Sequence, residues 1–62
     1  MISLKIAELR KRNNMTQQEL GDLLSVSYKT ISKWENGTCL PDVNTLPELS
    51  RIFNVSVDAL LG

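Results

Sequence analysis

Histidine is absent from this sequence of 62 residues, and cysteine occurs only once, at position 39. Zinc-site spacings need several such ligands, and a disulfide within the chain needs a second cysteine. We therefore expect no metal, no cofactor and a reduced thiol. Acid–base and nucleophilic catalysis need an activated pair of side chains, whereas the carboxylates here are scattered and have no histidine beside them. These absences argue against an enzyme.

Long apolar runs are also missing. No stretch reaches the 18 or so apolar residues of a membrane span, and the start MISLKIAELRKRNN is too charged for a secretory signal. We expect a soluble, cytoplasmic protein with no membrane partner. So short a chain buries only about 60% of the surface that it exposes when unfolded, so residues 1–62 should form a single domain that needs nearly every apolar residue in its core.

The charges are unevenly distributed although the chain is neutral overall. Residues 1–37 carry six of the seven basic and four of the seven acidic side chains, a balance of +2. Residues 38–62 carry one basic and three acidic side chains, a balance of −2. This asymmetry favours one face that meets a polyanion and another that is kept away from it.

Apolar periodicity predicts an all-α chain with five helical segments and no strand. The expected segments are 2–12, a helix between Thr16 and Ser25, about 28–36, one that starts near residue 44 or 45, and a last turn after Ser56. Thr16 and Glu19 form a capping-box pattern, and Ser27 is expected to cap the following helix. The expected core residues include Ile2, Ile6, Leu9, Leu20, Leu23, Leu24, Ile31, Trp34, Leu49, Phe53 and Ala59 to Leu61. Cys39 is expected to be a small, partly buried residue in a loop, with a redox switch or an intermolecular disulfide as alternatives.

The segment 28–36 separates its polar and apolar residues. At about 100° per residue, one arc holds Tyr28, Lys29, Ser32, Lys33 and Asn36. The opposite side holds Ile31 and Trp34. Such an arc is what a helix in the DNA major groove needs, because the groove presents donors and acceptors at base edges. A merely solvated helix face would have the same pattern.

The stretch TQQELGDLLSVSYKTISKWENG resembles the helix-turn-helix of the Cro and phage-repressor family, whose pattern is T-Q-x-x-L-A, then V-S, then I-S-x-W-E-x-G. The matching residues are Thr16, Gln17, Leu20, Val26, Ser27, Ile31, Ser32, Trp34, Glu35 and Gly37. The resemblance continues through PDVNTLPELSRIFNVSVDALL and so covers essentially the whole chain. It implies a compact five-helix domain of the lambda-repressor-like type, in which helices two and three form the helix-turn-helix.

The resemblance also implies a function, namely sequence-specific binding of double-stranded DNA by a transcriptional regulator, as a repressor. The hypothesis assigns base contacts to Tyr28, Lys29, Ser32 and Lys33. It assigns contacts with the DNA backbone to Thr16, Gln17, Ser27, Asn36 and Arg12, although Arg12 is more simply explained, with Lys11, as a solvated helix end that the helix dipole favours. A structural ion pair is implied between Arg10 and Glu35. We expect a homodimer on a palindromic operator. The expected contact surface is in the C-terminal half, near helix five and the loop before helix four, with Val57, Leu61 and Arg51 as exposed candidates.

Two positions depart from the family pattern. Gly21 stands where alanine is common, which still permits close helix packing. Ser25 stands where glycine is common, so either Ser25 is left-handed or the turn differs. The loop TCLPD has no basic residue, so a single domain should bind DNA weakly and with a modest salt dependence.

The alternative function is an antitoxin-type or scaffold module whose main partner is another protein.

Overall fold

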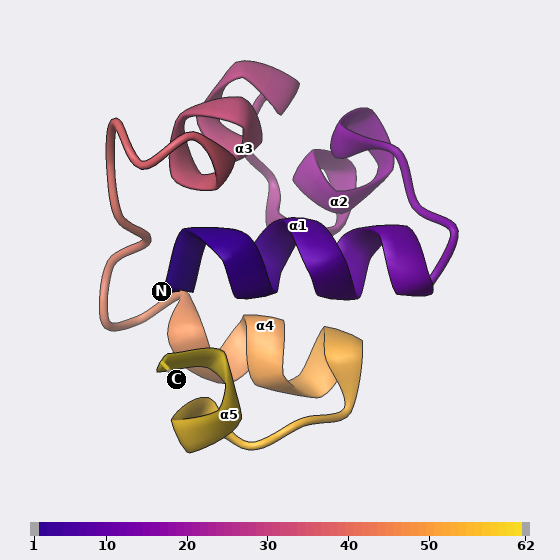
Figure 1. The fold of residues 1–62 in the computed structure, drawn as a ribbon. Helices are drawn as coiled ribbons and strands as arrows, with labels where there is room; N and C mark the ends of the chain where they lie inside the picture. The colour runs from indigo at the N-terminus through magenta and orange to yellow at the C-terminus, as the bar shows by residue number, and fades with distance from the viewer. Residues whose placement is uncertain (1, 62) are drawn as a thin grey trace.

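A computed structural model describes the backbone of residues 2–61 and the side chains of residues 5–61. Within this range the chain forms five helices and no strand: α1 (Ile2–Arg12), α2 (Gln17–Leu24), α3 (Tyr28–Glu35), α4 (Leu46–Phe53) and α5 (Val57–Leu61). Figure 1 shows α1 in the middle, with α2 and α3 on one side of it and α4 and α5 on the other. The expected all-α, five-helix architecture is confirmed. No helix in the described part of the chain is long and apolar enough to cross a membrane.

The helix starts follow their capping residues. Thr16 Oγ1 accepts from the Glu19 N–H at 3.0 Å, and Glu19 Oε1 accepts from the Thr16 N–H at 2.8 Å, so the capping box is present. Ser27 Oγ accepts from the Thr30 N–H at 3.4 Å, and Ser56 Oγ accepts from the Ala59 N–H at 3.1 Å. Because a helix leaves its first N–H groups without intrahelical acceptors, these side chains determine where α2, α3 and α5 begin.

Left-handed residues end several helices. Among residues 2–61, the non-glycine residues with positive φ are Asn14, Ser25 and Asn54, at 58°, 61° and 55°. Of the two alternatives for Ser25, the left-handed conformation is therefore the one found. Gly37, with φ of 81°, follows α3 just after its C-cap Asn36.

The core combines residues from all five helices. The buried apolar side chains among those described are Ile6, Leu9, Leu20, Leu24, Ile31, Trp34, Leu49, Phe53 and Leu60. Partly buried residues packed against them are Met15, Val26, Leu46, Ile52 and Val55. The α1 helix packs against α3 and α5, and therefore connects the two sides of the molecule. The side chain of Ile2, also expected in the core, lies outside the described residues.

Several residues expected in the core are on the surface. Leu23 is 58% exposed because Leu20 and Leu24 take the buried side of α2, and Leu23 lies beside that side. In α5 only Leu60 enters the core, since the single turn buries one position and leaves Ala59 and Leu61 exposed. Cys39 is also exposed, because the loop that carries it runs over the surface.

The turn between α2 and α3 packs closely on α2 at Gly21. A Cβ atom added there would lie 2.7 Å from the carbonyl oxygen of Val26, a distance that real Cβ atoms essentially never show. The Val26 N–H in turn donates to the Gly21 carbonyl at 2.9 Å. The close packing expected at Gly21 is thus a contact between two backbone segments.

Candidate nucleic-acid interface

Helix α3 presents a polar face on the outside of the molecule. Tyr28 is 47% exposed, Lys29 and Lys33 are exposed, and Ser32 is half-buried. Ile31 and Trp34 are 0% and 6% exposed and anchor the opposite side of the helix in the core. Neither lysine forms an ion pair with another residue of the described chain. Both ammonium groups are therefore available to an external acceptor.

The start of α2 adds backbone donors. Helix geometry leaves the N–H groups of Gln17 and Gln18 without intrahelical acceptors, and such helix starts attract anions. The hydroxyl and N–H of Thr16 are both used in the capping box. Arg12 is exposed in the last turn of α1, next to the exposed Lys11. The residues expected to contact the DNA backbone therefore include the start of α2 and the cationic end of α1.

An ion pair joins α1 to α3. Arg10 Nε donates to Glu35 Oε2 at 2.6 Å, and Arg10 Nη2 donates to Glu35 Oε1 at 3.1 Å. The two side chains are only 12% and 10% exposed. Arg10 Nη1 also donates to the Met15 carbonyl at 2.7 Å, directly before the start of α2. The pair implied by the family resemblance is present, and it also fixes the connection between α1 and α2.

Gln17 lies against this ion pair. Its Nε2 donates to Glu35 Oε1 at 3.1 Å, so the side chain that was expected to contact phosphate already has an internal partner. Sequence reasoning missed this contact. The two residues are 18 positions apart and on different helices, and the contact depends on the angle between α2 and α3.

The other expected backbone contacts lie at the two ends of α3. Ser27 is the exposed N-cap, with its hydroxyl directed to the Thr30 N–H. Asn36 is the C-cap, and its Oδ1 accepts from both the N–H and the hydroxyl of Thr38. The amide N–H groups of Asn36 form no hydrogen bond with the described residues. These donors remain available to an external acceptor.

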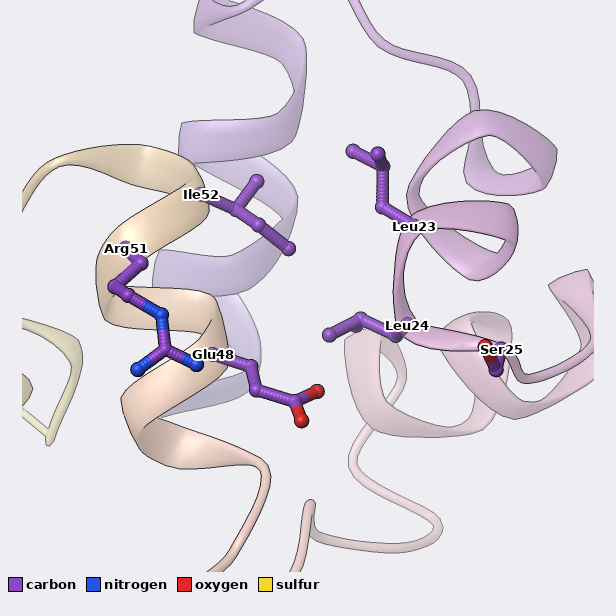
Figure 2. Close-up of a pocket in the computed structure, with 6 residues that line it drawn as sticks. All are labelled: Leu23, Leu24, Ser25, Glu48, Arg51 and Ile52. Carbon is purple, nitrogen blue, oxygen red and sulfur yellow. The ribbon is translucent and has the colours of Figure 1, made fainter.

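A shallow cleft of about 400 Å³ lies on another part of the surface, between the end of α2 and α4. Figure 2 shows Leu23 and Leu24 of α2 pointing across it toward Ile52 of α4. Glu48, Arg51 and Ser25 complete its lining. The cleft is open to solvent, and its lining holds no nucleophile paired with a base, so it lacks the arrangement that covalent or acid–base catalysis needs.

Comparison with known proteins identifies the arrangement of α2 and α3. The Helix-turn-helix family model matches residues 6–60. The chain is 42% identical over 58 residues to the HTH-type transcriptional activator BcrR of Enterococcus faecalis, covering 94% of this chain and 28% of the relative. It is 31% identical over 61 residues to the Cryptic phage CTXphi transcriptional repressor RstR of Vibrio cholerae, covering 98% of this chain and 54% of the relative.

A third relative carries a different kind of name. Antitoxin PezA of Streptococcus pneumoniae is 32% identical over 62 residues, which cover 100% of this chain and 39% of the relative. The chain thus spans 28% to 54% of the length of these three proteins. Their names describe regulators and an antitoxin rather than enzymes. The resemblance to the Cro and phage-repressor type is confirmed, and the chain belongs to the Helix-turn-helix family.

Proposed function

We propose that residues 1–62 act as a single DNA-binding unit of a cytoplasmic transcriptional regulator, and that α3 enters the major groove of double-stranded DNA. The observation that supports this most strongly is the polar outer face of α3, which is held by buried Ile31 and Trp34 and carries two lysines that form no ion pair with any described residue. The major groove admits one α-helix and distinguishes all four base pairs. A helix with one face anchored and the other free fits that geometry.

In this proposal the residues divide into base readers and backbone contacts. Lys29 and Lys33 donate to the O6 and N7 acceptors of guanine, Tyr28 packs on a thymine methyl or donates to a phosphate, and Ser32 donates or accepts at a base edge. Contacts with phosphate set the position of the domain on the duplex without reading its sequence. The proposed backbone contacts are Thr16, Gln17, Ser27, Asn36 and Arg12.

We propose repression as the direction of regulation. A domain bound in the major groove occupies DNA that the transcription machinery needs, and the relative RstR is named a repressor. The relative BcrR, however, is named an activator. In vitro transcription from a promoter that contains the bound site tests the direction: repression predicts less transcript as protein is added, and an increase would contradict it.

The base-reading proposal is tested with a duplex selected from a random library by the wild-type chain. Lys33→Ala is expected to weaken binding to that duplex by about 1–3 kcal/mol and to relax the preference at one position, because a lysine-to-guanine contact is lost. Binding to a scrambled duplex at the same salt concentration should change much less. Lys5→Ala removes the same charge outside α3 and should leave the ratio of the two affinities unchanged.

We also propose that two copies bind one palindromic site. A single recognition helix covers few base pairs, and helix-turn-helix proteins gain specificity by placing two copies on half-sites about one helical turn apart. Large apolar residues are exposed on the loop between α3 and α4 and at the end of α5: Leu40 by 69%, Val43 by 79% and Leu61 by 53%. Of the residues expected in this contact, Arg51 and Leu61 are exposed and Val57 is half-buried.

Sedimentation tests the assembly. The isolated chain is expected to be mainly monomeric, because one recognition domain offers only a small contact surface, and two chains should bind each palindromic duplex. Disruption of one half-site should lower the affinity for both copies. One chain per intact duplex at saturating protein would contradict the dimer.

A second candidate function is an antitoxin-type or scaffold module that binds another protein. The similarity to PezA, which is named an antitoxin, favours it. The test is the ratio of the affinity for the selected duplex to that for the scrambled duplex. If Lys29→Ala and Lys33→Ala both leave this ratio unchanged, α3 does not read bases, and binding of another protein becomes the proposed function.

A further inference from the structure

We propose that Glu35 is a positioning residue for the contact between Gln17 and a DNA phosphate. Its carboxylate takes one N–H of the Gln17 side-chain amide and leaves the second N–H for a phosphate oxygen. This inference rests on the proposed DNA-binding function. It concerns how the Gln17 side chain is held, before DNA binds, in the position from which it contacts a phosphate.

The first support is the set of donors around the carboxylate. Glu35 Oε1 accepts from Gln17 Nε2 and from Arg10 Nη2, each at 3.1 Å, while Oε2 accepts from Arg10 Nε at 2.6 Å. A glutamine amide has two N–H donors, and a single bond to Glu35 uses one of them. The side chain of Gln17 is thus anchored at its nitrogen, while its second N–H has no acceptor among the described residues.

The second support is electrostatic. A carboxylate next to a phosphate would repel it, but the Arg10 guanidinium lies against Glu35 and cancels its charge. The side chains of Arg10 and Glu35 are only 12% and 10% exposed, so neither presents much surface to a duplex. Gln17 is half-buried at the edge of the pair, which makes it the member of the three that can reach the DNA.

The third support is that the same guanidinium holds the start of α2. Arg10 Nη1 donates to the Met15 carbonyl at 2.7 Å, one residue before the N-cap Thr16. The backbone donors at the start of α2 and the side-chain donor of Gln17 are therefore fixed by one ion pair. Fixing a long side chain before binding reduces the conformational entropy that is lost on binding.

The test compares Gln17→Ala in two backgrounds, with random-sequence duplexes because a phosphate contact does not depend on sequence. One background is the wild-type chain. The other combines Arg10→Met with Glu35→Leu, since replacing both members of a buried ion pair by apolar residues commonly preserves the fold. Circular dichroism establishes that each variant is folded at the temperature of the binding measurement.

In the wild-type chain, Gln17→Ala is expected to weaken binding by about threefold to tenfold, the loss of one hydrogen bond. In the apolar-pair background the same change is expected to weaken binding by less than about twofold, since Gln17 is no longer held for the phosphate. Gln18→Ala is the matched control. Gln18 also donates to a carboxylate, that of Asp22 at 2.9 Å, but it is exposed and forms no hydrogen bond with Arg10 or Glu35. Its effect should be the same in both backgrounds.

A second variant keeps the test independent of the double replacement. Glu35→Gln retains an acceptor oxygen for Gln17. In this background, Gln17→Ala should therefore weaken DNA binding by more than it does in the apolar-pair background. An equal effect of Gln17→Ala in all three backgrounds would overturn the role of Glu35 while leaving DNA binding intact. Failure of the folded wild-type chain to bind any duplex at low salt would instead remove the proposed function, and this inference with it.

Discussion

Glu35→Ala is expected to lower the free energy of unfolding by about 3–5 kcal/mol, because it leaves the nearly buried Arg10 guanidinium with the Met15 carbonyl as its one partner among the described residues. At about 0.05–0.15 kcal/mol per residue, a chain of this length has a total stability of about 3–9 kcal/mol. A large fraction of the variant should therefore be unfolded at 25 °C. Urea denaturation followed by circular dichroism measures the effect.

The chain contains its own control for this prediction. Lys5 and Glu8 form an ion pair at 3.9 Å whose side chains are 42% and 55% exposed. Water and salt screen such a pair, so Glu8→Ala should change the free energy of unfolding by less than about 0.5 kcal/mol. Similar losses for Glu8→Ala and Glu35→Ala would show that burial does not set the strength of the Arg10–Glu35 pair.

Leu20→Ala is expected to lower the free energy of unfolding by about 2–5 kcal/mol. Leu20 is 0% exposed, and its side chain fills space in the core that alanine would leave empty. Because the core of so small a domain consists of few side chains, neighbours have little room to close the cavity. Thermal unfolding monitored by the fluorescence of Trp34, which lies in the same core, measures the loss.

Leu23→Ala provides the comparison within the same helix. It removes the same atoms three residues away, but from a side chain that is 58% exposed. The expected change in the free energy of unfolding is within about 0.5 kcal/mol. A loss as large as that of Leu20→Ala would mean that Leu23 is covered in solution, and would contradict its exposed position.

The helix boundaries were predictable because they depend on local chemistry. Thr16 with Glu19, Ser27 and Ser56 each supply a side-chain acceptor within three residues of the donor, so the signal is contained in a short stretch of sequence. Asn14, Asn54 and Gly37 are residue types that tolerate a left-handed backbone. These positions required no knowledge of how the helices pack.

Which residues are buried, and which side chains meet between helices, depends on packing that no short sequence pattern specifies. Periodicity identifies an apolar stripe but not its exact width, so it placed Leu23 and Leu61 in the core together with Leu20 and Leu60. The bond between Gln17 and Glu35 depends on the angle at which α2 meets α3. The ion pair of Arg10 with Glu35 was expected from the family resemblance alone, since nothing in the local pattern connects residues 25 positions apart.

The backbone contact at Gly21 bears on how the proposed base preference of this domain can evolve. At this point the carbonyl of Val26 rests on a position without a side chain, so no rotamer change there can alter the angle between α2 and α3. The exposed residues of α3 lie on its other side and take no part in this contact. In the proposed binding mode, substitutions at Lys29 or Lys33 therefore change which bases are preferred while the angle between α2 and α3 stays the same.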